Sequence, residues 1–311
     1  MLFYRVSYLF ILLLLLIFEG SSLAQIHFQV ATRQVIETRL RGFSSNNRQR
    51  EATLKRMFAG VGCGDHLSEQ PVRHVKEPNL ICVLPGADDS AIVVGAHFDH
   101  VEWGEGVVDN WSGSSLLPSL YENLHASPTK HTFIFIAFTA EELGLIGSRA
   151  YVHEMKPDEV RRTRAMVNLD SLGLSDTKVW LSHSDKQLAG ALYAVATAMK
   201  LPISAVNVDN VGSTDSESFW ARGIPRITIH SVTQETFPIL HTRQDRLSAI
   251  KFDDYYNTYR LLAAYLTYIV VLSDKPSNLQ EIQQKQTSSS CGVPLEKSRP
   301  APVPVRPLPR G

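Results

Sequence analysis

Short apolar segments that alternate with helix-like segments constrain the fold of this chain more than any other feature. Residues 132–139 contain Phe133-Ile134-Phe135-Ile136, a continuous apolar run typical of a strand covered on both faces. Further strands are predicted at residues 79–84, 91–96, 165–169, 179–181 and 226–230. Helices are predicted at residues 112–125, 141–153, 186–199 and 252–272. This alternation predicts an α/β fold, a three-layer α/β/α sandwich around a mostly parallel mixed sheet.

The part of the chain before the first of these strands has a helical pattern. Apolar residues recur at helix-like intervals between residue 25 and about residue 73, which predicts a helical leader. The segment Pro85-Gly86-Ala87-Asp88-Asp89 between strands 79–84 and 91–96 is typical of a tight turn. We therefore expect these two strands to form a hairpin.

Composition excludes several classes of protein. The 311 residues are 44% hydrophobic and 20% charged with only 16 Pro, which indicates a mainly globular chain rather than a collagen, a coiled coil or a disordered protein. The 31 Lys and Arg residues balance 31 Asp and Glu residues, so no long-range basic field exists. We expect no nucleic-acid partner.

The two ends of the chain differ from the globular part. Arg5 precedes an apolar run at residues 8–18, and Ser22-Leu23-Ala24 offers the small residues that a signal peptidase reads. A membrane anchor is the alternative, but the run is shorter than the roughly 20 residues that span a bilayer. We expect a signal peptide at 1–24, no integral membrane segment after its removal, a secreted or periplasmic location, and a domain at 25–276. Residues 277–311 are polar and then Pro-rich, which predicts a flexible tail.

Three cysteines allow one disulfide in an oxidising compartment. We prefer the pair Cys63 and Cys82, with Cys291 left over in the tail, and the alternative is that all three stay reduced. None of them has the paired spacing of a thiolate zinc site. Any metal should therefore be sought among histidines and carboxylates.

Polar residues of metal-ligand type follow the predicted strands, which is where open α/β sheets place their ligands. These residues are His97, Asp99, Asp109, Glu141, Glu142, Asp170 and His241. A single carboxylate at a strand end is more often a helix cap or a solvated residue. The adjacent Glu141 and Glu142 repel each other at the edge of a core unless cations meet them. Because no matching set of Arg or Lys stands beside these acids, a metal is the simplest explanation.

Five motifs that follow one another along the chain resemble those of a known family, and five in the same order are more specific than any one of them. They are Gly95-Ala96-His97-Phe98-Asp99, Val108-Asp109-Asn110 with Gly113, Glu141-Glu142-Leu143-Gly144 with Gly147-Ser148, Asn168-Leu169-Asp170, and His241-Thr242 with Asp245. They resemble the motifs of the M28 family of dizinc peptidases over residues 93–250. The resemblance implies a zinc-exopeptidase-like fold.

The resemblance also implies a role for each motif residue. Asp109 bridges two Zn²⁺ ions, His97 and Asp170 complete one site, and Glu142 and His241 complete the other. The charges of two Zn²⁺ are then balanced by three carboxylates and a bridging hydroxide, without any Lys or Arg.

Two further residues would act beside the metals. Glu141 is the general base that takes a proton from the water bound to the two zinc ions, which becomes the hydroxide. Asp99 orients the ring of His97. A cis peptide between Asp109 and Asn110 is implied as well.

The chain departs from the family pattern at two positions. Ser216 stands where His is usual, and Leu240 stands where some members carry a Tyr thought to stabilise the oxyanion. Neither change removes a metal ligand. The aromatic residues Trp103, Phe219, Trp220 and Phe237 are candidates for the substrate pocket but equally for packing, so they stay unassigned.

The resemblance leads to a functional expectation with alternatives. We expect a monomeric, secreted zinc aminopeptidase that acts on peptide substrates. A glutaminyl-cyclase-like transferase is the first alternative, and it is disfavoured because such cyclases lack the histidine at His97 and its metal. An M28 carboxypeptidase stays open. An inactive M28 domain serving as a binding module would be expected to lack ligands or the base, and all of them are present here.

Overall fold

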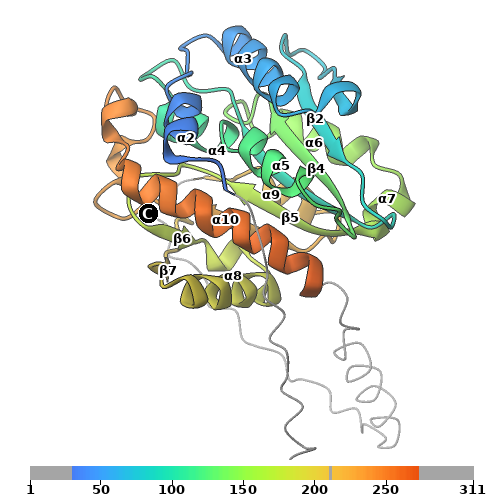
Figure 1. Ribbon diagram of the computed structural model, residues 1–311. Coiled ribbons are helices and arrows are strands. Elements are labelled where there is room, and N and C mark those ends of the chain that lie inside the picture. The colour runs from blue at the N-terminus through green and yellow to red at the C-terminus, as the bar shows by residue number, and fades with distance from the viewer. Residues whose placement is uncertain (1–29, 210–211, 273–311) are drawn as a thin grey trace, which may run out of the picture. The chain divides into compact units, whose positions relative to one another are not determined.

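The computed structural model describes residues 30–209 and 212–272 of the chain (Figure 1). The predicted signal peptide, the Pro-rich tail and Cys291 lie outside the described residues. In the part that is described, no helix combines the length and the apolar character needed to cross a membrane.

The described strands form one eight-stranded sheet. They are β1 (Leu67–Gln70), β2 (Asn79–Leu84), β3 (Ala91–His97), β4 (Thr132–Phe138), β5 (Thr163–Leu169), β6 (Thr177–Val179), β7 (Ile203–Ala205) and β8 (Arg226–His230). Their order in the sheet is β1-β2-β4-β3-β5-β8-β6-β7. The central strands β4, β3, β5 and β8 are parallel, whereas β1–β2, β2–β4 and β6–β8 pair antiparallel. The mixed sheet with a parallel centre confirms the predicted fold class.

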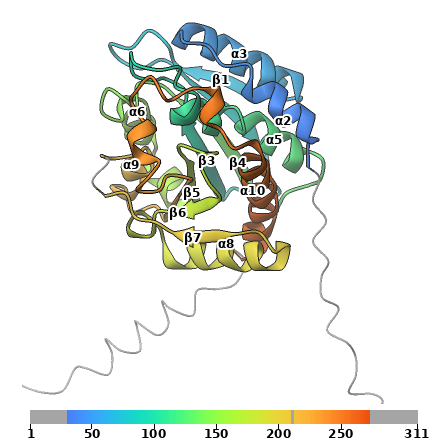
Figure 2. The same ribbon diagram turned by 90° about the vertical axis from the view of Figure 1, so that its left-hand side faces the viewer.

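Helices cover both faces of the sheet. One face carries α2 (Arg33–Leu40), α3 (Asn47–Gly60), α5 (Leu117–His125), α8 (Lys186–Met199) and α10 (Phe252–Leu272). The other face carries α6 (Ile146–Glu154), α7 (Pro157–Arg162) and α9 (Ser216–Trp220). In Figure 2, α6 and α9 lie on one side of the strands, and α5 and α10 lie on the other.

The strand β4 shows how the sequence builds these layers. Phe133 and Phe135 pack into the core under α5 and α10, whereas Ile136 and Phe138 pack into the core under α6 and α9. Successive side chains of a strand point to opposite faces, so a continuous apolar run supplies both cores at once.

The predicted hairpin between residues 79–84 and 91–96 is wrong. The strand β4 lies between β2 and β3, pairing antiparallel with β2 and parallel with β3. Every residue of β3 is buried, whereas β2 has partly exposed positions. A wholly buried strand belongs in the middle of a sheet with a neighbour on each edge, which places β3 beside β4 and β5.

Other boundaries also differ from the predictions. The predicted helix at 141–153 begins only at Ile146, because residues 141–145 form a turn in which Gly144 and Leu145 have positive φ. The predicted helix at 112–125 is divided into α4 (Ser112–Ser114) and α5. The helical leader ends before β1, which the helical pattern did not predict. Helices α8 and α10 and strand β8 match their predictions.

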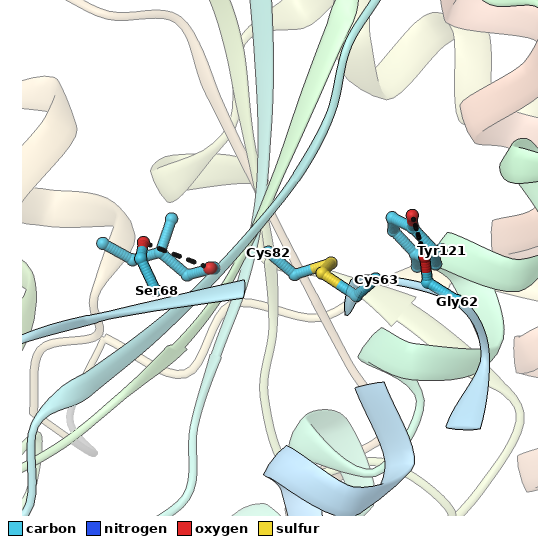
Figure 3. Close-up of a disulfide and its surroundings, with 6 residues drawn as sticks. Gly62, Cys63, Ser68, Cys82 and Tyr121 are labelled. Carbon is cyan, nitrogen blue, oxygen red and sulfur yellow. Dashed lines mark hydrogen bonds between the residues drawn. A yellow bond between two sulfur atoms is a disulfide. The ribbon is translucent and has the colours of Figure 1, made fainter. Parts of the chain in front are cut away.

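A disulfide joins Cys63 to Cys82, which confirms the preferred pairing. Cys63 follows α3, Cys82 lies in β2, and both are buried in the larger core (Figure 3). Next to the bond, the hydroxyl of Tyr121 donates to the carbonyl of Gly62 at 3.3 Å. The disulfide therefore fixes the end of α3 against the sheet.

Replacing both cysteines by serine should lower the free energy of unfolding by about 2–4 kcal/mol, because the bond restricts the unfolded chain. Urea unfolding of the wild type with and without reductant measures the effect, and the double variant should not respond to reductant. An unfolding midpoint of the wild type that reductant leaves unchanged would contradict this account.

Candidate metal centre and active site

The residues predicted to bind metal come together at one edge of the sheet. His97 ends β3, Glu141 and Glu142 follow β4, and Asp170 directly follows β5. His241 lies in the loop after β8, beyond the short η4 turn (Phe237–Ile239). Because β3, β4, β5 and β8 are parallel, their carboxyl ends deliver these side chains to the same edge.

Asp109 lies at the centre of the group. It belongs to the η2 turn (Val107–Trp111), and the peptide between Asp109 and Asn110 is cis, as the resemblance implied. The Oδ1 of Asp109 is 3.2 Å from Nε2 of His97, and its Oδ2 is 3.1 Å from Nε2 of His241. The two oxygens of one carboxylate thus face two different histidines.

The other acids complete the two sides of Asp109. The Oδ1 of Asp170 is 3.8 Å from Nε2 of His97, and Oε2 of Glu142 is 3.1 Å from Nε2 of His241. The second oxygen of Glu142, Oε1, is buried without a hydrogen-bond partner among the described residues. The ligand atoms of His97, Glu141 and Asp170, and those of His97, Asp109 and Glu142, lie close enough together to hold a metal ion. Imidazole nitrogens and carboxylate oxygens are donors that zinc accepts, so the residues present fit the metal.

The backbone carbonyl of Asp99 selects one tautomer of a neutral His97 ring. Its Nδ1 lies 3.2 Å from the backbone carbonyl of Asp99, and a carbonyl can only accept. Nδ1 must therefore donate, and when the ring is neutral the lone pair is on Nε2, which faces Asp109 and Asp170. This is the arrangement that presents a histidine to a metal.

The acids at this edge strongly favour positive charge. Hydrogen bonds to Asp109 and Glu142 raise the pKa of His241 to about 10. Burial acts to raise the pKa of Asp109, but hydrogen bonds from His241 and His97 hold it below its usual range. Protonation of the histidines or binding of cations would compensate this excess of negative charge.

Glu141 faces the same cavity but differs from its neighbour. Burial raises the pKa of Glu141 to about 10, and the nearby Asp215, Asp170 and Asp109 act in the same direction. Its Oε2 is 3.9 Å from Nε2 of His97, whereas Glu142 contacts His241. Glu141 thus lies on the His97 side of the cavity, and Glu142 lies on the His241 side.

Asp99 lies behind the cavity and does more than the sequence indicated. Its Oδ1 is 3.6 Å from Nδ1 of His97. The same carboxylate accepts hydrogen bonds from the backbone amides of Glu141, at 3.1 Å, and Glu142, at 3.2 Å. Asp99 therefore orders the segment that carries both glutamates as well as the His97 side.

A cavity of about 220 Å³ opens above these residues. Its apolar wall consists of Leu145, Trp180, Val208, Val232 and Leu240. His230 adds an uncharged ring to the cavity lining, because burial lowers its pKa to about 4 and both ring nitrogens bond backbone groups of Val206 and Val232.

The unassigned aromatic residues do not line this cavity. Phe219 is buried in the core against Phe138 and Tyr151. Trp103, Trp220 and Phe237 are exposed. The aromatic residue that does line the cavity is Trp180, which no sequence pattern distinguished.

The departures from the family pattern have local explanations. The hydroxyl of Ser216 lies 2.8 Å from that of Thr228, so a buried hydroxyl pair occupies the position where His is usual. Leu240 lines the cavity directly before His241.

Several supporting residues were not predicted. Thr214 donates to Oδ2 of Asp170 at 2.7 Å and accepts from Asn168 at 2.6 Å. Asp245, which had no predicted role, accepts from the backbone amides of Val108 and Asp109. Asp245 stood in the His241 motif without a role, and Thr214 had none either, because each acts on a loop distant in sequence.

Known proteins resemble this chain in sequence and in fold. The profile of Peptidase family M28 matches residues 79–266. Aminopeptidase YwaD of Bacillus subtilis (strain 168) is 27% identical over 248 residues, which cover 77% of this chain and 52% of YwaD. The solved zinc aminopeptidase BSAP from Bacillus subtilis gives a TM-score of 0.56 at 27% identity, covering 61% of this chain and 49% of BSAP.

A glutaminyl cyclase from an Acidobacteriales bacterium shares the fold, with a TM-score of 0.64 at 18% identity, covering 80% of this chain and 99% of the cyclase. The chain spans about half the length of the Bacillus aminopeptidases it matches. The family profile matches more than half of the sequence, and the chain therefore belongs to peptidase family M28.

Proposed function

We propose that this chain is a zinc aminopeptidase that removes N-terminal residues from peptides and binds two zinc ions. The observation that carries the proposal is the position of Asp109, whose two oxygens face His97 and His241 at 3.2 Å and 3.1 Å. His97 and Asp170 would hold one zinc, Glu142 and His241 would hold the other, and Asp109 would be shared. When bound, zinc polarises the scissile carbonyl, acidifies the attacking water and lowers the pKa values of neighbouring carboxyl groups.

The residues of the chain would then perform the proton transfers. The carboxylate of Glu141 takes a proton from the attacking water and passes it to the nitrogen of the leaving amine. Asp99 keeps Glu141 in place through the backbone amide of that residue and faces the Nδ1 side of His97. A side chain that transfers a proton is most effective when its backbone is held in place. The hydrogen bond to Asp99 holds the backbone of Glu141 in this way.

The lining of the cavity favours an aminopeptidase over a carboxypeptidase. Among its described lining residues are Glu141 and Asp170, which suit the free ammonium group of a peptide N-terminus, and there is no Arg or Lys to hold a terminal carboxylate. The apolar wall that includes Trp180 and Val232 suits an apolar first side chain.

A cyclase-like activity is the second candidate, since a glutaminyl cyclase shares the fold. The position of His97 against Asp109 supports hydrolysis instead, because it supplies the nitrogen ligand for a second metal. The Cys63–Cys82 bond supports an oxidising compartment, in agreement with the expectation of a secreted or periplasmic enzyme.

Glu141→Gln should keep the metal and lose at least about 10²-fold in kcat, since the amide cannot accept the proton. Cleavage of an aminoacyl p-nitroanilide and metal content per chain measure the two effects. Glu235→Gln, the same change at an exposed glutamate, is the matched control and should behave as the wild type. Full turnover in the Glu141 variant would remove Glu141 from the mechanism.

Asp109→Asn should lose at least one zinc per chain, because the amide keeps the shape but not the charge that two cations share. Elemental analysis after gel filtration gives the zinc content. Asp176→Asn, at an acid paired with Lys178 away from the cavity, is the control. Two tightly bound zincs in the Asp109 variant would show that the bridging assignment is wrong.

Leucyl substrates should be cleaved at least about tenfold more efficiently than glutamyl substrates, because the apolar wall offers no cation to an acidic side chain. The ratio of kcat/KM for the two p-nitroanilides measures this preference. N-terminal glutaminyl peptides should be hydrolysed rather than cyclised. Equal efficiency for both side chains would place the first residue outside this cavity.

A further inference from the structure

Arg50 is a fully buried cation in α3, upstream of the region that the M28 profile matches. Four hydrogen bonds to backbone carbonyls hold its guanidinium. Nε donates to Ser44 at 2.6 Å, Nη1 donates to Phe98 at 2.9 Å, and Nη2 donates to Glu105 at 2.5 Å and Gly106 at 2.9 Å. None of these acceptors is a side chain, so the contacts fix the course of the backbone.

The carbonyls that Arg50 holds belong to two loops with predicted metal ligands. Phe98 stands between His97 and Asp99, and Gly106 lies three residues before Asp109. A single planar group thus sets the separation between the loop after β3 and the η2 turn.

Asp245 holds the same turn from its other side. Its carboxylate accepts from the amides of Val108 and Asp109 at 2.7 Å and 3.0 Å, and its backbone carbonyl accepts from the amide of Glu105 at 2.7 Å. Because Asp245 is four residues after His241, the loops of three predicted ligands meet at this framework. Backbone carbonyl oxygens face the guanidinium of Arg50, and backbone amides face the carboxylate of Asp245. Both charged groups therefore have favourable hydrogen-bond partners.

The fit around Arg50 is close. A Cβ on Gly106 would lie 2.8 Å from Nη2 of Arg50 and 2.4 Å from Cβ of His100, and Gly106 has a φ of +56°. The indole ring of Trp111, also in η2, lies 5.7 Å from the guanidinium carbon. Burial lowers the pKa of Arg50 only to about 10, so the group stays charged at neutral pH.

We propose that Arg50 is a positioning residue for the metal centre, which it serves by holding the His97 loop and the Asp109 turn in register. This inference rests on the proposed dizinc function. It assigns to the leader helix α3 a part in metal binding, although α3 contributes no ligand. The disulfide at the end of α3 keeps this helix in place.

The test compares Arg50→Met, Arg50→Lys and Arg39→Met in the full chain. Methionine keeps the length of the side chain but removes every donor, and lysine keeps the charge but cannot form the fork of contacts. Arg39 lies on the neighbouring helix α2, where its side chain contacts Ser119 and Glu122 rather than the ligand loops. Only its backbone carbonyl meets the η2 turn, through the indole of Trp111, and the substitution leaves that carbonyl in place. The measurements are zinc affinity of the metal-free protein against a competing chelator, the absorption spectrum of the cobalt-substituted protein, and the unfolding midpoint.

Arg50→Met should bind zinc about 10–100-fold more weakly and show an altered cobalt spectrum, as expected when a group that orients ligands is lost. Arg50→Lys should bind zinc about tenfold more weakly than the wild type. Arg39→Met should keep the wild-type zinc affinity and cobalt spectrum even if its unfolding midpoint changes. If Arg50→Met does not fold, the lysine variant decides the question.

Two results would overturn the proposal. An Arg50 variant with a lowered unfolding midpoint but wild-type zinc affinity and cobalt spectrum would make Arg50 a purely structural residue. Full restoration by lysine would show that charge alone matters. A wild type that binds neither zinc nor cobalt would instead refute the proposed function, and this inference with it, so the two failures are distinguishable.

Discussion

The structure depends on one electrostatic constraint: parallel strands bring several carboxylates to a single edge where they are largely removed from water. Asp109 is buried, Glu141 is buried, and both lie within reach of His97. Anions at this density are stable only if cations or hydrogen-bond donors meet them. Two observations reflect this requirement: the pKa of His241 is raised, and the buried Oε1 of Glu142 has no hydrogen-bond partner in the part of the chain that the structure describes.

The surrounding fold meets the constraint in layers. Asp99, Thr214 and Asp245 bind backbone amides or ligand oxygens, so that each predicted ligand loop has a second contact that fixes it. Arg50, in helix α3, contributes a positive charge that binds the backbone carbonyl of Gly106 near Asp109. The apolar cores on both faces of β4 fix the strand ends from which these loops start, because the strands cannot shift without opening a packed interior.

The grouping of His97, Glu141 and Asp170 at one edge was predictable because these residues end or directly follow strands whose apolar character is plain. Asp109 and His241 lie in loops further along the chain, and only the family resemblance joined them to this group. The ends of α8 and α10 were predictable for a similar reason, since their periodic patterns are long. Strand order was not, because the turn between β2 and β3 has the same residues whether the strands pair or separate around β4. Arg50 and Trp180 were not predictable either, because their roles arise from packing between segments far apart in sequence.

The central claim is that the chain binds two metal ions around Asp109. A calorimetric titration of the metal-free protein with zinc tests this claim most directly. We expect the wild type to saturate at two zinc ions per chain and Asp109→Asn to bind one zinc ion or none. Saturation of the wild type at a single zinc would contradict it, and would leave the contact between His97 and Asp109 without a metal to explain it.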